Sequence, residues 1–367
     1  MQKFDISHEY NYDLWNEGVC DRKELEISWI YACLNPARQS VSRFLDLHQP
    51  NFQLSPFFIL FFHLYDRSNY FLDRIIETAD LPLSDARLKK LISEPITLNG
   101  NWDDFARIVE HRGLVPLHAM PGMGYHPHKT DFMLVLKNRL LYGAMELRDA
   151  FKEDIPAVRK KIIDDVVEIL ADRLGAPPET FNWNYKTKGG ESKSLTDITP
   201  MDFALHCTDF FPDSYTVVFD EALRGRVTGK NCVFMPVNVM KELVTLQLRL
   251  HGQVVVGADT RQQSNRMLGI LDTKFNDNAS VFGSDIEMPK DRAIAYRVIE
   301  VTEYLSLDGV EVDTETLEPV RFKAQDSHGG DTGADGHYMM SADWFEKYVL
   351  FAVLFNPAVP DEYRKRK

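Results

Sequence analysis

The chain has 367 residues, of which 44% are hydrophobic and 26% are charged, a balance typical of a globular protein. Its formal net charge is −13. Contacts from Lys and Arg to phosphate supply most nucleic-acid affinity, so this charge argues against DNA or RNA binding and against anionic membrane surfaces. The longest apolar run, Pro56–Phe62, is far shorter than the roughly 20 residues of a membrane helix. We therefore expect neither a nucleic-acid partner nor a membrane partner.

The cysteines and the N-terminus suggest where the protein acts. The four cysteines are widely spaced and include no CxxC pair: Cys20, Cys33, Cys207 and Cys232. The first residues are polar and lack the apolar segment of a signal peptide. This pattern predicts a cytoplasmic protein with free thiols.

The early part of the chain carries helical periodicity. Helices are predicted over residues 28–47, 55–79, 153–174 and 236–250. After Gly252 the pattern changes, and strands are predicted at 254–257, 297–304 and 320–324. Helices that come first and strands that come later favour an α+β fold in which the two are segregated.

Six segments with distinctive residues follow one another along the chain. They lie at residues 28–35 (SWIYACLN), 66–73 (DRSNYFLD), 99–121, 177–183, 264–272 (SNRMLGILD) and 326–345. In this order they resemble segments of the bleomycin hydrolase and aminopeptidase C family, which are papain-like cysteine peptidases. The resemblance extends over about residues 20–355.

This resemblance implies an α+β, papain-like, two-lobed fold, with a helical lobe, a β-barrel-like lobe and a helical insertion. Residues 1–367 are expected to form one such domain. The mainly helical lobe is expected at about 20–80 and 205–250, the largely helical insertion at about 80–200, and the β-rich lobe at about 252–345. Members of the family form hexameric rings, so the resemblance also implies a homo-oligomer.

A peptidase of this family needs a Cys nucleophile, a His that ionises it, an Asn that orients the His and a Gln that donates to the oxyanion. Here Ser28 stands at the nucleophile position, and Arg22, six residues earlier, stands at the Gln position. Asp326 stands at the Asn position, and His328 replaces the Trp that normally follows it. Every position that can be matched therefore departs from the family pattern.

The catalytic histidine is expected at or near Ile294–Tyr296, where this sequence has none. No histidine occurs between His251 and His328. A serine without a base has no acceptor for its proton, and loss of such a group costs several orders of magnitude in rate. Trp29 and His328 remain candidate residues of the cleft.

The first hypothesis is therefore a catalytically inactive homologue, a pseudo-peptidase that keeps the cleft to bind a peptide, an amino-acid-like small molecule or a protein partner. The alternative is a repurposed enzyme, such as an amidase, an acyl transferase or an aminopeptidase-like hydrolase. It would use Ser28 with Asp326 and His328, which share one face if that segment is extended. A third hypothesis is a scaffold that assembles with an active relative.

Some of these residues also have a purely structural interpretation. Ser28 suits the N-cap of the helix that follows it, since its hydroxyl can accept from a backbone N–H. The histidines His118, His126 and His128 lack Cys or carboxylate partners at zinc-like spacing. No metal and no cofactor are expected.

Overall fold

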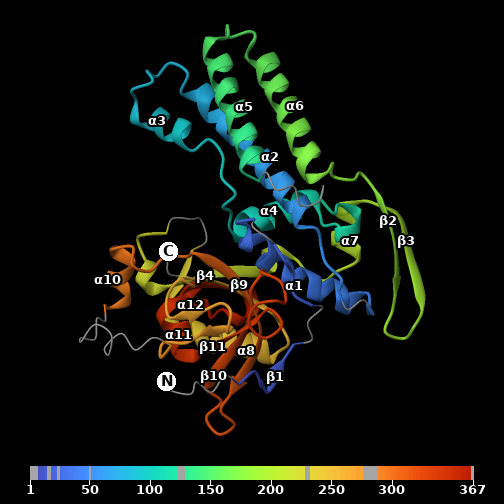
Figure 1. Ribbon diagram of the computed structural model, residues 1–367, viewed down its shortest axis with the longest axis vertical. Helices are drawn as coiled ribbons and strands as arrows, with labels where there is room; N and C mark the ends of the chain where they lie inside the picture. The colour runs from blue at the N-terminus through green and yellow to red at the C-terminus, as the bar shows by residue number, and fades with distance from the viewer. Residues whose placement is uncertain are drawn as a thin grey trace. The chain divides into compact units, whose positions relative to one another are not determined.

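The computed structural model describes residues 7–14, 18–22, 25–48, 51–122, 129–227, 232–275 and 288–364 (Figure 1). The chain divides into two compact units. Unit 1 consists of Met1–Glu24, Tyr31–Phe52 and Thr208–Lys367, and unit 2 of Leu25–Ile30 and Gln53–Cys207. Unit 1 is built on a large sheet, and unit 2 is built mainly on helices.

A mixed sheet forms the framework of unit 1. Its strand order is β5-β4-β12-β6-β9-β10-β11-β8-β7, and β1 pairs beside β9. The strands are β1 (Tyr12–Asp13), β4 (Tyr215–Asp220), β5 (Val233–Met235), β6 (Val254–Ala258), β7 (Ser264–Asn265), β8 (Ile270–Leu271), β9 (Glu303–Val312), β10 (Pro319–Gln325), β11 (His337–Ser341) and β12 (Val349–Phe355). Every residue of β6 is buried, which agrees with its continuous apolar sequence and with cover on both faces.

Short helices pack around this sheet. They are α8 (Val237–Arg249), α10 (Lys290–Ala295), α11 (Ala342–Tyr348) and α12 (Asp361–Arg364), with single 3-10 turns η2 (Pro212–Ser214), η3 (Glu221–Leu223) and η4 (Asn356–Ala358). The apolar core includes Trp344 of α11, whose indole N–H donates to the Gln262 carbonyl at 2.9 Å. The rings of Phe322 and Phe345 lie 5.0 Å apart beside it. A buried indole with its N–H satisfied stabilises this core without a polar penalty.

Helix α1 (Ser28–Phe44) continues from unit 2 into unit 1. Within unit 1 it meets polar groups of the sheet and its neighbouring loop. The Asn35 amide donates to the Gln325 side chain, and the Gln39 side chain accepts from the Gln253 backbone N–H at 3.4 Å. The first bond links the helix to the end of β10, the strand that leads to Asp326, and the second links it to the residue before β6.

Unit 2 contains a bundle of α2, α5 and α6, whose helices contact one another pairwise. Its elements are α2 (Pro56–Glu77), α3 (Ala86–Ser93), α4 (Trp102–Arg112), η1 (Leu117–Ala119), α5 (Lys129–Asp149), α6 (Ile155–Leu174), β2 (Phe181–Lys186), β3 (Ser192–Ile198) and α7 (Pro200–His206). Ser55 caps α2, since its hydroxyl accepts from the Phe58 N–H at 3.2 Å, and Pro56 opens the first turn. Strands β2 and β3 pair as a separate antiparallel hairpin.

The four predicted helices are present, each within a few residues of its expected ends. The strand predicted at 297–304 is wrong, because helix α10 ends at Ala295 and β9 begins only at Glu303. The span 205–250 holds strands β4 and β5 as well as α8, and the span 80–200 holds the β2–β3 hairpin as well as helices. The pairing of β4 with the distant strand β12, and of β5 with β4, leaves no mark in the local periodicity of the sequence.

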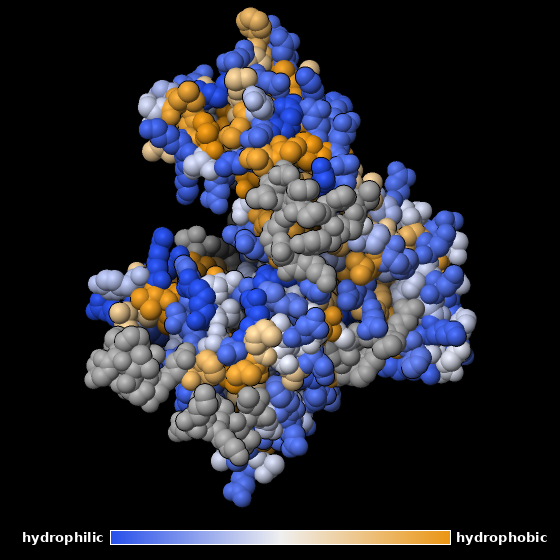
Figure 2. Space-filling view, viewed as in Figure 1, coloured by the Kyte–Doolittle hydropathy of each residue, from blue (hydrophilic) through white to orange (hydrophobic). Residues whose placement is uncertain are grey.

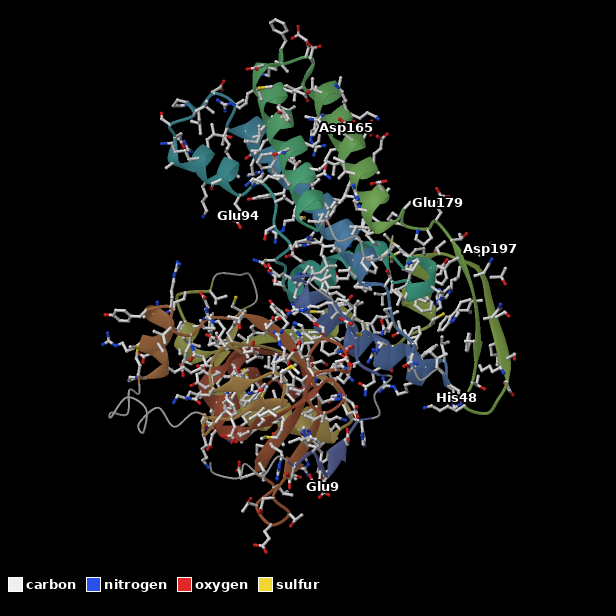
Figure 3. The ribbon with its side chains drawn as sticks, viewed as in Figure 1. Glu9, His48, Glu94, Asp165, Glu179 and Asp197 are labelled. Carbon is white, nitrogen blue, oxygen red and sulfur yellow. The ribbon has the colours of Figure 1, made fainter. Side chains whose placement is uncertain are left out.

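The surface of unit 2 carries both apolar and acidic side chains. Figure 2 shows apolar side chains exposed over its helices, where Leu134, Tyr142 and Met145 of α5 are exposed by 54%, 64% and 55%. Figure 3 shows acidic side chains at the surface, such as Glu94 and Glu179. Among the described residues, no helix is both long and apolar enough to cross a bilayer.

Candidate functional site

A short antiparallel contact brings the N-terminal segment of unit 1 beside the loop after β10. The Arg22 N–H donates to the Ser327 carbonyl at 2.8 Å, and the Gly329 N–H donates to the Cys20 carbonyl at 3.0 Å. These two backbone bonds set the register of the segment. They place the Arg22 side chain among those of the 326–328 turn.

Asp326 is held by two side chains. The Tyr338 hydroxyl, on the neighbouring strand β11, donates to Asp326 Oδ2 at 2.7 Å. His328 Nδ1 lies 2.7 Å from Asp326 Oδ1, a close contact in which the N–H is not well aligned with the oxygen. The structure therefore brings together Asp326 and His328, the pair considered from the sequence.

The charge of Asp326 is favoured by its neighbours. Burial alone would raise the pKa of this carboxyl, but His328, the Tyr338 hydroxyl and the nearby Arg22 guanidinium outweigh burial and lower the pKa. Burial and the Asp326 carboxylate in turn raise the pKa of Tyr338. The tyrosine thus remains a proton donor to a carboxylate that stays ionised.

Arg22 forms a second set of contacts. One of its terminal nitrogens lies 2.6 Å from Glu303 Oε1 and 2.9 Å from His328 Nε2. The side chains of Arg22 and Glu303 are exposed by only 7% and 16%. The ion pair is therefore largely removed from water, where a charged group requires a partner.

Glu303 is the member of this cluster that the sequence reasoning missed. It is the first residue of β9, in phase with the buried Leu305 and Leu307. Side chains at alternate strand positions share one face, so a carboxylate in phase with core leucines needs a cationic partner. That alternation was a signal in the sequence, but it did not identify Arg22 as the partner.

The contact with Arg22 determines which ring nitrogen of His328 accepts a hydrogen bond. A guanidinium has only N–H groups to offer, so His328 Nε2 must accept, and a neutral ring then carries its proton on Nδ1, toward Asp326. In this arrangement the lone pair of the imidazole is already engaged. The ring is bound as a structural link between a cation and a carboxylate.

Ser28 and Trp29 belong to unit 2 and open helix α1. Ser28 is buried and is the first residue of α1. The Trp29 indole N–H donates to the Leu98 carbonyl at 2.9 Å, and the ring lies 4.9 Å from that of His63. A Cβ on Gly100 would come within 2.4 Å of the Trp29 ring, so glycine is needed there.

The region expected to hold the catalytic histidine lies on and just after α10. Ile294 is buried in the apolar core of unit 1, and Tyr296 is exposed by 73%. Lys290, at the start of this helix, donates to the Glu346 and Val349 carbonyls, both at 2.7 Å. These contacts hold α10 against the end of α11 and the start of β12.

The described residues contain no group of three or more His, Cys, Asp or Glu side chains placed to hold a metal. His118 Nε2 lies 3.1 Å from the Asn182 carbonyl, and its ring lies beside those of Phe181 and Trp183. His126 and His128 lie outside the described residues.

Comparisons with known proteins show which family the chain resembles. A family model described as Peptidase C1-like family matches residues 2–366. Aminopeptidase C of Lactobacillus delbrueckii subsp. lactis is 26% identical over 386 residues, covering 100% of this chain and 85% of that protein. Aminopeptidase C of Streptococcus thermophilus is 28% identical over 372 residues, covering 94% of this chain and 82% of that protein.

A solved structure agrees with these sequence matches. The crystal structure of PepW from Lactobacillus rhamnosis HN001 matches with a TM-score of 0.89 at 26% identity, covering 97% of this chain and 84% of that one. The predicted α+β fold of the papain-like class is thereby confirmed. The chain belongs to the Peptidase C1-like family.

Proposed function

We propose that this protein is a pseudo-peptidase, a homologue of aminopeptidase C that does not hydrolyse peptides. The observation that carries the proposal is the engagement of His328 Nε2 by Arg22 at 2.9 Å. A general base needs a free lone pair within reach of the proton that it removes. In His328 that lone pair is bound to a guanidinium that is itself buried.

The charges around His328 support the same proposal. Removing Arg22 from Nε2 would separate it from Glu303 as well, because one nitrogen of Arg22 contacts both groups. Separating a buried ion pair is costly, since each ion loses its partner without gaining water. The arrangement in which Arg22 binds both Glu303 and His328 is therefore favoured over one in which His328 Nε2 is free to act as a base.

A serine hydroxyl is a weak nucleophile until an adjacent base accepts its proton. The resemblance assigns Ser28 to the nucleophile position, Asp326 to the orienting position and Arg22 to the oxyanion position. We propose that these replacements leave a site for binding a peptide or an amino-acid-like ligand, or for a protein partner.

We also propose that the protein acts in the cytoplasm as a homo-oligomer. The exposed apolar side chains of α5 support assembly, because Leu134, Tyr142 and Met145 share the face opposite the buried Leu140 and Leu147. A helix that is apolar on both faces is usually covered on both. Sedimentation equilibrium at micromolar protein is expected to give a multiple of the 42.3 kDa chain mass, and a monomer would contradict this.

The activity test uses a panel of aminoacyl-coumarin amides. Wild-type protein, Ser28→Ala and the exposed control Ser93→Ala are all expected to release coumarin at the rate of buffer alone. Turnover by the wild type and by Ser93→Ala that is lost in Ser28→Ala would refute the proposal, and would support the repurposed hydrolase. Calorimetric titration with amino-acid amides and dipeptides then tests whether the site retains binding.

A further inference from the structure

The position of the missing histidine can be assigned from the contacts in unit 1. The region expected from the sequence, Ile294–Tyr296, does not meet the other replaced residues: Ile294 points into the core and Tyr296 is exposed. Lys290 anchors this helix through the Glu346 and Val349 carbonyls. An imidazole at Tyr296 would therefore face solvent.

Glu303 has the opposite surroundings. Its strand β9 lies directly beside β10, the strand that ends just before Asp326. The Glu303 carboxylate shares one nitrogen of Arg22 with the His328 imidazole, and His328 in turn contacts Asp326. Glu303 thus lies in one continuous cluster with residues assigned to the glutamine and asparagine positions.

We infer that Glu303 occupies the place of the catalytic histidine, and that Arg22 and Glu303 together replace the glutamine and the histidine of an active site by a closed ion pair. The inference rests on the proposed function, since it explains how the base was lost. The two changes depend on each other physically. A buried Arg22 without an acid, or a largely buried Glu303 without a cation, would leave an unpaired charge with little access to water.

This assignment also explains the role of His328. With Glu303 in the imidazole's place, Asp326 has no ionised histidine to orient there. Instead, His328 Nδ1 lies 2.7 Å from Asp326 Oδ1, and His328 Nε2 accepts from a terminal N–H of Arg22 at 2.9 Å. The imidazole of His328 thereby links the carboxylate of Asp326 to the guanidinium of Arg22.

The first test measures the pKa of an introduced imidazole by NMR. In an Arg22→Gln/Glu303→His variant we expect this pKa to fall by about one unit when Asp326→Asn is added, because a nearby carboxylate favours the imidazolium. In the matched Arg22→Gln/Tyr296→His variant, Asp326→Asn should leave the pKa of the exposed imidazole unchanged. An imidazole at position 303 that does not respond to Asp326→Asn would overturn the assignment.

The second test restores the family's residues. One set combines Arg22→Gln, Ser28→Cys, Asp326→Asn and His328→Trp with Glu303→His, and the matched set replaces this last change by Tyr296→His. Hydrolysis of aminoacyl-coumarin amides at least tenfold above wild type is expected only in the Glu303→His set, after circular dichroism has shown that both sets fold.

Hydrolysis in the Tyr296→His set alone would overturn the assignment. If neither set hydrolyses the amides, the NMR comparison decides the assignment. Hydrolysis by the wild-type protein would refute the proposed function instead. That result would leave the dependence of the introduced imidazole on Asp326 intact, so the two failures are distinguishable.

Discussion

His63 provides a sharp test of the electrostatics of unit 2. It lies within α2 and is fully buried. Burial lowers the pKa of His63 to about 4; Asp104 and a backbone hydrogen bond at Thr97 oppose the shift, and Arg67 and Arg107 add to it. The folded state therefore favours the neutral form of the His63 ring.

The sign of the pH dependence follows from the lowered pKa. Above pH 6.5, the ordinary value for His63, the ring is neutral whether the chain is folded or unfolded, and its contribution is constant. Between pH 6.5 and about 4 the unfolded chain binds a proton that the folded chain does not, so stability falls as the pH falls. The loss is about 2 kcal/mol at pH 5 and about 3 kcal/mol below pH 4.

The assay compares guanidinium unfolding of wild type and His63→Leu at pH 7.5, 6 and 5, followed by the helical circular dichroism signal. The variant should lose less stability than wild type on acidification, by about 2 kcal/mol at pH 5. His111→Leu, at an exposed position on α4, should follow the wild-type dependence. Parallel curves for wild type and His63→Leu would refute the argument.

Three further substitutions test packing, capping and the buried ion pair by the same unfolding measurement. Gly113→Ala should destabilise by more than about 1 kcal/mol, because φ is +82° and the new Cβ would lie 2.1 Å from the Pro200 carbonyl oxygen; an unchanged midpoint would contradict this. Ser55→Ala should cost about 1 kcal/mol or more through loss of the α2 cap, and Ser55→Thr should recover part of it. Arg22→Met should cost about 3–5 kcal/mol by leaving Glu303 unpaired, whereas Arg22→Met with Glu303→Leu should restore most of the loss; equal losses in both would argue against the ion pair.

The candidate site divides into parts that the sequence predicted and parts that it missed. The i, i+2 spacing predicted that Asp326 and His328 share one face if the segment is extended, and the two side chains do lie 2.7 Å apart, although the chain bends at Ser327 between them. Glu303 was missed because its partner Arg22 is 281 residues away in the chain. Spacing carries no information about a contact over such a separation.

The amino-acid sequence was sufficient to predict the main helices and the family. The periodicity of residues 28–47, 55–79, 153–174 and 236–250 predicted helices that the structure contains, since local apolar spacing decides which face of a helix is buried. The resemblance of six ordered segments predicted the family, and the comparisons confirm it.

The contacts between segments that are distant in the chain could be read only from the folded structure. The strand expected at 297–304 begins at Glu303 instead, because α10 is fixed by contacts with α11 and β12 that no local pattern records. The cluster of Arg22, Glu303, Asp326 and His328 depends on the pairing of β9 with β10 and on the N-terminal segment lying against the 326–329 turn. Such pairings arise from packing of the whole sheet, whereas local periodicity reports only which face of each element is buried.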